Sequence, residues 1–332
     1  PQVPEGAGLC IFDGRLKDLA ARTSEMPYQA VLAAIPRPNQ AFWTLSALWA
    51  GWLWGREAAA PFKSVLRRRR YDWDWHAEAL EAAFKHLFEL LSPETPFFGL
   101  AAEAEPLFLN AVLAAADLAG FELQTCAVRT VHDPVQIGWR RRAQMASPGS
   151  APETATMRAA LLEYLRQRGE AATYFHLHAA GLSALAEAGM LTRPAQAINL
   201  CLAETNAVVQ QTLRTCDGLT HHDAGAHGVE AGLWGLASAS DQAEPLPDRV
   251  EMEAVRFLAR HPDSSLTEIE GDLYGKFPGL LTPPRALLQA VLDSYGLQAE
   301  GRWRLRLEDI PATRRAALET IARLIRGIGQ RL

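Results

Sequence analysis

Short apolar runs alternate with helical periodicity along the first part of the 332-residue chain. A short run of aliphatic and aromatic residues has the length of a strand, whereas apolar residues at i, i+3, i+4 and i+7 indicate a helix packed on one side. The predicted strands are 9–12, 28–35, 96–101, 121–130 and 135–142. The predicted helices are 41–55, 76–91 and 104–119. The pattern predicts an α/β domain over residues 1–146, with mostly parallel strands and a closing antiparallel hairpin.

After a stretch rich in Ser, Pro and Gly at 147–152, helical periodicity dominates and the fold class changes to α+β. Two units with the same succession of helices and strands follow, at 153–240 and 246–332. The first unit has predicted helices at 157–168, 173–178, 180–188 and 195–214, a loop at 217–228 and a strand at 229–237. The second has predicted helices at 250–260, 265–277, 283–295 and 311–332, and an alternating strand at 302–306. Each unit is expected to be a winged helix.

The stretch 28–55 is the most informative part of the chain. The apolar run 28–35 is expected to be a strand buried on both faces, ended by Pro36 and Pro38, because proline fixes φ and cannot donate to a ladder. The helix after it carries several tryptophans, which favour a core helix; stacking on nucleic-acid bases is the alternative. At 15 residues and followed by charge, the helix is too short for a membrane span.

This order of strand, proline turn and aromatic helix resembles motif IV of the DNA amino-methyltransferases, which methylate adenine N6 or cytosine N4. In that family the turn reads Asp/Asn/Ser-Pro-Pro-aromatic, and the matching residues here are Ala34, Ile35, Pro36 and Arg37. The family stacks a flipped base on the aromatic ring, and the acidic or amide side chain accepts from its exocyclic amine. Ala34 offers no acceptor and Arg37 no aromatic ring. A shifted alignment restores Asn39 and Phe42 but loses both prolines, so the motif is degenerate.

The resemblance extends over most of the chain. The predicted domain 1–146 is similar to the second half of a class I (Rossmann-like) methyltransferase sheet, without the Phe-x-Gly-x-Gly loop that holds the cofactor. Asp13 is a candidate contact to S-adenosylmethionine, although a turn or capping role is the more ordinary assignment. The C-terminal phrases at 277–296 and 303–315 resemble large bacterial DNA methylase-like proteins. The resemblance implies no cofactor for this chain alone, and S-adenosylmethionine if another chain completes the sheet.

The distribution of charge bears on the choice of binding partner, and the cysteines bear on the cellular compartment. The net charge of −5 gives no global signal for nucleic acid, but arginines cluster locally. In the second unit, Arg285 and Gln289 lie on the third helix, and strand alternation places Arg302, Arg304 and Arg306 on one face, away from Trp303 and Leu305. Two further basic blocks are Arg67, Arg68, Arg69 and Arg70, and Arg140, Arg141 and Arg142. The scattered cysteines, with Cys10 and Cys126 in predicted strands, indicate a reducing compartment and hence the cytoplasm.

Other chemistry is sparse. His221, His222 and His227 with nearby Cys216 are candidate zinc ligands, although a polar loop is the simpler interpretation. Paired acids occur at Glu103 and Glu105, at Asp72 and Asp74, and at Glu308 and Asp309; acids in such positions before helices also serve the helix dipole.

The sequence favours a non-catalytic protein: a methyltransferase-like half sheet carrying tandem winged helices that bind double-stranded DNA or another protein chain. The first alternative is an active methyltransferase completed by a missing segment or a partner chain. The second is a module for protein–protein interaction alone. No membrane partner is expected.

Overall fold

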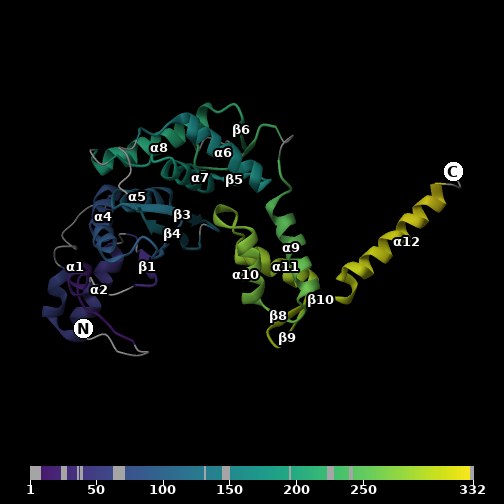
Figure 1. The fold of residues 1–332 in the computed structure, drawn as a ribbon, viewed down its shortest axis with the longest axis horizontal. Coiled ribbons are helices and arrows are strands. Elements are labelled where there is room, and N and C mark those ends of the chain that lie inside the picture. Colours follow the sequence, from purple (N-terminus) through teal and green to yellow (C-terminus); the bar gives the residue numbers. More distant parts are fainter. Residues whose placement is uncertain are drawn as a thin grey trace. The chain divides into compact units, whose positions relative to one another are not determined.

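The computed structural model describes residues 9–23, 28–35, 37, 40–62, 72–130, 132–143, 150–193, 196–222, 228–238 and 242–329 (Figure 1). The chain forms two compact units. The N-terminal unit comprises residues 1–164 and 172–237, and the C-terminal unit comprises 165–171 and 238–332. The helices and strands after the 147–152 stretch are therefore divided between two bodies, and most of the segment 153–240 belongs to the same body as the first sheet.

The N-terminal unit is built on a four-stranded sheet. Its strands are β1 (Val31–Ile35), β2 (Phe97–Ala101), β3 (Phe121–Ala127) and β4 (Val135–Arg141). The order is β1-β2-β4-β3; β1 and β2 are parallel, and β4 is antiparallel to both of its neighbours. The mixed α/β class and the predicted hairpin at 121–142 are confirmed. Helices α4 (Trp73–Leu90) and α5 (Pro106–Leu118) connect the strands.

One face of this sheet is closed by aromatic packing. Phe97 stacks on Trp139 with ring centroids 4.8 Å apart, and Phe84 of α4 meets Phe97 edge-on at 5.5 Å. Gly99 leaves room for the Trp139 ring and for Ile35, because a Cβ at this position would come within 2.5 Å of that ring. Aromatic pairs in such geometries add to the stabilisation from buried area. The core of the N-terminal unit therefore starts from this face.

The opposite face of β1 and β2 stays open. Leu32 pairs across to Phe98, and Ala34 to Leu100. All four side chains are exposed, Leu32 to 82%. The expectation of a strand buried on both faces is wrong, because among the described residues β1 has a strand neighbour on one side only and the helices that pack on the sheet cover its other face.

Two more expectations fail at the start of the chain. The predicted strand 9–12 is irregular, Leu9 and Ile11 are exposed, and Cys10 lies in coil rather than in a strand. Four apolar residues do not make a strand without a partner, and no described strand pairs with them. The first helix is α1 (Leu16–Thr23), which packs on α4.

The tryptophan-rich helix forms where expected, but it is not a core helix. Helix α2 (Gln40–Trp54) packs chiefly on the 3₁₀ helix η1 (Arg56–Phe62). Trp49, Trp52 and Trp54 are exposed, the last two to 74%. The prediction that these rings are buried is wrong, because α2 is apolar around its circumference and the described part of the unit covers only a fraction of it.

The remainder of the N-terminal unit follows α6 (Thr154–Arg168). Its elements are β5 (Ala172–Thr173), α7 (Tyr174–Glu187), α8 (Ile198–Thr215), β6 (Leu219–His222) and β7 (Leu233–Leu236), with the small sheet in the order β5-β7-β6. The two helices predicted at 173–178 and 180–188 are one helix, because Ala179 continues it without a break. The predicted loop 217–228 contains strand β6, which pairs with β7.

Helix α5 joins the sheet to these later helices. Its residues from Phe108 to Asp117 are all buried, and α5 contacts α4 and β3 as well as α7 and α8. Asn110, 1% exposed, donates to the Leu202 carbonyl at 3.2 Å and to Thr205 Oγ1 at 2.9 Å. At the other end of the helix, Asp117 accepts hydrogen bonds from Arg142 and Thr192. These polar contacts fix how α5 sits against its neighbours.

The C-terminal unit repeats the same order of elements. Its elements are α9 (Leu246–Arg260), β8 (Ser264–Ser265), α10 (Leu266–Lys276), η2 (Gly279–Leu281), α11 (Arg285–Tyr295), β9 (Gly296–Ala299), β10 (Arg302–Leu305), η3 (Leu307–Asp309) and α12 (Pro311–Gly329). The sheet order is β8-β10-β9. Ser265 begins α10 with a capping box to Glu268. Trp303 and Leu305 join the core of the unit, so the alternation predicted for β10 is confirmed.

The predicted final helix forms as α12, and its apolar residues Leu318, Ile321, Ile325 and Ile328 are exposed. The first turns of α12 contact the rest of the unit, where the Arg314 guanidinium lies 5.5 Å from the Tyr295 ring centroid and donates to Asp309 at 2.7 Å. None of the described helices is both long and apolar enough to cross a membrane.

A testable weakness lies in α7. His178 is fully buried, and neither of its ring nitrogens has a partner among the described residues. Burial lowers the pKa of His178 from its ordinary value of 6.5 to about 3. As the pH falls below about 6.5, His178 therefore binds a proton in the unfolded chain but stays neutral in the folded chain. Because the unfolded state binds more protons, the free energy of unfolding decreases as the pH falls from 6.5 towards 3.

We expect His178→Leu to raise the free energy of unfolding by about 1–3 kcal/mol, because it removes two unpaired polar atoms at similar volume. It should also flatten the pH dependence between 6.5 and 4 in chemical denaturation. The exposed His132→Leu is the matched control and should change neither quantity. A His178→Leu variant that is less stable than the natural chain at pH 5 would contradict this assignment.

Candidate functional site

An ion-paired cluster lies where β1 and β2 end. Arg37 follows β1, and its guanidinium contacts the carboxylates of Glu103 at 2.5 Å and Glu105 at 2.8 Å, which follow β2. Parallel neighbours bring their carboxyl ends to one edge, which is why residues 66 positions apart meet. Partial burial raises the pKa of Glu105, while the charge of Arg37 lowers it.

The same guanidinium lies over an aromatic ring. Arg37 is 5.6 Å from the centroid of Trp73, the first residue of α4, whose start is capped by the Asp72 carboxylate accepting from the Trp75 N–H at 2.8 Å. Trp73 stacks on Phe108 at 5.6 Å, and both rings contact His76. His76 Nε2 is buried without a partner among the described residues, and burial lowers the pKa of His76 to about 4. The Arg37 guanidinium of the ion pair therefore packs against the ring of Trp73, which belongs to an aromatic cluster with Phe108 and His76.

The residues of the degenerate motif IV lie in different surroundings. Ala34 is exposed on the open face of the sheet, Ile35 is buried at the end of β1, and Arg37 enters the ion-paired cluster. Pro36 and Asn39 lie outside the described residues. Phe42 is in the first turn of α2, and its side chain is not described. Asp13 lies in an exposed irregular stretch before α1.

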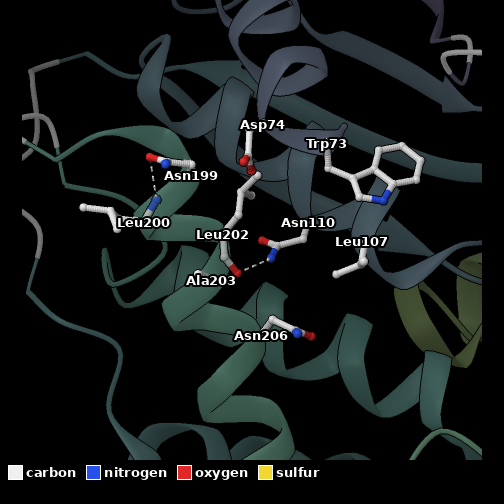
Figure 2. A pocket seen from close by; sticks show the side chains of 9 residues that line it. All are labelled: Trp73, Asp74, Leu107, Asn110, Asn199, Leu200, Leu202, Ala203 and Asn206. Atoms are coloured by element: carbon white, nitrogen blue, oxygen red, sulfur yellow. Dashed lines mark hydrogen bonds between the residues drawn. The ribbon is translucent and has the colours of Figure 1, made fainter. Parts of the chain in front are cut away.

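A pocket of about 370 Å³ is also lined by Trp73. Figure 2 shows it between the first turns of α4 and α5 and the start of α8, with Leu107 and Leu200 at its rim and Asn110 turned towards Leu202. The lining combines amides and apolar side chains with the carboxylate of Asp74. Among its described lining residues there is no cation, thiol or hydroxyl nucleophile, and Asn110 is already bonded to α8.

Of the three histidines considered as metal ligands, His221 is engaged in packing. His221 is on β6, where its ring is parallel to that of Trp234 with centroids 4.1 Å apart, and its Nε2 lies 2.6 Å from the Ala231 carbonyl. His222 is exposed at the end of the same strand, and His227 lies outside the described residues. No group of three or more His, Cys, Asp or Glu side chains suited to a metal occurs in the described parts of the chain.

The arginines of the second unit differ from one another. Arg302 donates to the Asp263 carbonyl at 2.8 Å, and Arg306 donates to the Asp293 carbonyl at 2.7 Å, so both hold the hairpin to neighbouring segments. The side chain of Arg304 is exposed and makes no hydrogen bond or ion pair with a described residue. On α11, Arg285 is paired with Glu270 at 2.9 Å, and Gln289 donates to Asp293. Arg302 also lies 4.0 Å from the Glu268 carboxylate. Arg304 is therefore the arginine of β10 whose side chain is free of such contacts with described residues.

The other basic blocks give no open basic surface among the described residues. Arg141 donates to the Leu91 carbonyl at 2.8 Å and lies over the Phe88 ring, Arg142 binds Asp117, and Arg140 lies 3.8 Å from Glu94. The block Arg67 to Arg70 lies outside the described residues.

The sequence gives part of this site. It identifies Arg37 as the departure from motif IV and Glu103 with Glu105 as a pair of acids, but it assigns the acids to the helix dipole. Trp73 is not predicted. The available signal was the parallel pairing of β1 with β2, which brings residues just after both strands to one edge.

No protein family model, curated protein or solved structure matches the chain. The geometry of the site and the resemblance in the sequence are therefore the grounds for a functional proposal.

The cluster at the end of β1 makes a direct electrostatic prediction. In Arg37→Met, the pKa of Glu105 should rise, because the positive charge that lowers it is gone. The free energy of unfolding should change by less than about 1 kcal/mol, because Arg37 is 39% exposed and such pairs are screened by solvent. Carboxyl-carbon NMR titration measures the pKa. Arg15→Met, which removes another exposed pair with Asp18, is the control and should leave Glu105 unchanged. An unchanged or lower pKa in Arg37→Met would contradict the cluster.

Proposed function

We propose that the chain is a non-catalytic DNA-binding scaffold, built on a degenerate DNA methyltransferase-like half sheet with two winged helices. Support for the half sheet comes from its topology: a parallel pair, β1 and β2, is continued by an antiparallel hairpin. That arrangement fits the second half of a class I methyltransferase sheet. The repeated order of helix, strand, two helices and hairpin, with sheet orders β5-β7-β6 and β8-β10-β9, supports two winged-helix units.

One observation carries the non-catalytic assignment: the ion-paired cluster of Arg37. In the family that the sequence resembles, the turn after this strand holds an acceptor for the exocyclic amine and an aromatic ring for the base. Here the turn carries a cation held by Glu103 and Glu105 and seated on Trp73. Loss of groups that act on the reacting atoms costs orders of magnitude in rate. A cation bound in this way offers no acceptor to an amine.

DNA contact is proposed for the hairpin β9–β10. Phosphate contact needs a cation that is exposed and not already neutralised, and Arg304 meets both conditions. Arg285 and Gln289 would enter a groove only after leaving Glu270 and Asp293. Binding is therefore expected to be dominated by phosphates and to have little sequence preference.

We expect Arg304→Ala to weaken binding to duplex DNA and to lower the slope of log K against log salt by about one, without a change in thermal stability. Fluorescence anisotropy between low and moderate salt measures both. Arg158→Ala, an exposed arginine of α6, is the control and should bind as the natural chain does. Equal binding by Arg304→Ala and the natural chain, or no binding by the natural chain at low salt, would contradict the proposal. Either result would favour an interaction with protein instead.

The second candidate is a methyltransferase that another chain or segment completes. The observation in its favour is that no described strand pairs with the outer edge of β1, where a further strand could extend the sheet. We expect the chain alone not to bind S-adenosylmethionine, because a class I enzyme brings the cofactor close to backbone through a glycine-rich loop that the sequence lacks. Calorimetry tests this, with heat of dilution alone as the expected result. A dissociation constant in the low micromolar range would support the second candidate.

A further inference from the structure

The outer edge of β1 has free backbone groups. The Val31 N–H donates to the Pro96 carbonyl at 3.0 Å, and the Ile35 carbonyl accepts from Ala102 at 3.1 Å, so alternate residues of β1 face β2. The N–H and C=O groups of the residues between them, Leu32 and Ala34, therefore point to the other side. No described strand pairs with that side.

Residues 31–35 themselves carry no charge, proline or bulge that would prevent pairing. Their sequence is VLAAI, and the ladder with β2 is regular over all five residues. Leu32 is largely exposed, and it forms one apolar surface with the exposed Phe98 and Leu100 of β2. A flat, uncharged, apolar edge strand is a template for pairing with another chain.

A second apolar surface follows β1 in the chain. Helix α2 has no charged residue over its 15 residues, and Trp49, Trp52 and Trp54 are exposed together with Leu45, Leu48 and Leu53. A helix that is apolar all round is normally buried. Exposed tryptophans with no charge among them are typical of the centre of a protein interface.

We propose that a second copy of this chain covers the β1 edge, so that two β1 strands pair antiparallel about Ala33. This inference goes beyond the proposed function and does not depend on DNA binding or on the absence of catalysis. In that register Leu32 of each copy lies opposite Ala34 of the other, and these are the residues whose backbone groups point outwards. Leu32 and Ala34 exchange N–H···O=C bonds in both directions, and the two-fold axis passes beside Ala33.

Self-complementarity is the argument for a second copy. The register places the large Leu32 against the small Ala34 on the same face of a continuous sheet, so the two side chains do not compete for space. Because β1 and α2 are uncharged, the same surface can meet itself without like-charge repulsion. A five-residue strand pair alone buries less than the roughly 1,200–2,000 Å² of a stable interface. The proposal therefore requires further apolar area, and the exposed face of α2, which starts soon after β1 in the chain, is the surface that we propose for it.

Light scattering coupled to size-exclusion chromatography tests the pairing in the whole chain. The natural protein should have the mass of two copies at micromolar concentration, and Leu32→Lys should have the mass of one. Leu307→Lys is the matched control, since it places the same charge on an apolar residue that is 76% exposed in the C-terminal unit, and it should remain a dimer. Circular dichroism melts confirm that the variants are folded. A natural chain with the mass of one copy, or with a mass that grows beyond two copies with concentration, overturns the proposal.

Crosslinking tests the register. Ala33→Cys, in a Cys10→Ser background that removes the exposed native thiol, places two cysteines opposite each other across the two-fold axis. Their Cα atoms would be about 4.5 Å apart, within the range that a disulfide bridges. Mild oxidation should convert Ala33→Cys into a covalent dimer that a reductant reverses, whereas Leu307→Cys in the same background should stay monomeric on a denaturing gel. No crosslink at Ala33, or equal crosslinking at Leu307, overturns the antiparallel register.

Discussion

The burial of α5 is the constraint on which the N-terminal unit depends. An apolar helix that is buried along most of its length needs apolar surface on more than one side, and the sheet with α4 covers only part of it. Helices α7 and α8 cover the rest. The unit is therefore one body, although its halves lie on either side of a stretch whose composition predicts a linker. The hydrophobic term draws these helices together without fixing how they lie, and the two polar residues of α5 supply that geometry.

Asn110 and Asp117 show how that geometry is fixed. Each is a polar group that would be costly to bury without a partner, and each finds its partner on a segment far along the chain. Asn110 binds α8, and Asp117 binds both the end of β4 and the segment before α8. A shift of α8 along α5 would break these bonds. The pocket of Figure 2 lies beside the Asn110 contact, so its shape is set by the same bonds.

Local signals predict most elements but not their surroundings. Periodicity and end residues identify α4, α5, α10 and α11, because the spacing of apolar residues and the residues at helix ends are local properties of the sequence. Burial is predicted badly for β1 and α2, because the sequence of an apolar segment is the same whether or not another part of the protein covers it. The contact of Arg37 with Glu103 and Glu105 depends on strand pairing, which is not visible in residues 66 positions apart. The sequence does not distinguish Arg302, Arg304 and Arg306 as candidates for phosphate contact. In the structure, the side chains of Arg302 and Arg306 donate to backbone carbonyls, whereas that of Arg304 does not.

We propose that the Arg37 cluster replaces a catalytic turn by a structural one, in a chain that binds DNA without modifying it. A filter-binding assay with duplex DNA and methyl-labelled S-adenosylmethionine tests both halves of that claim in one reaction. The account predicts that DNA is retained at low salt and released as salt rises, with no label transferred to the DNA by the purified chain. Transfer of the methyl label to adenine or cytosine would contradict it.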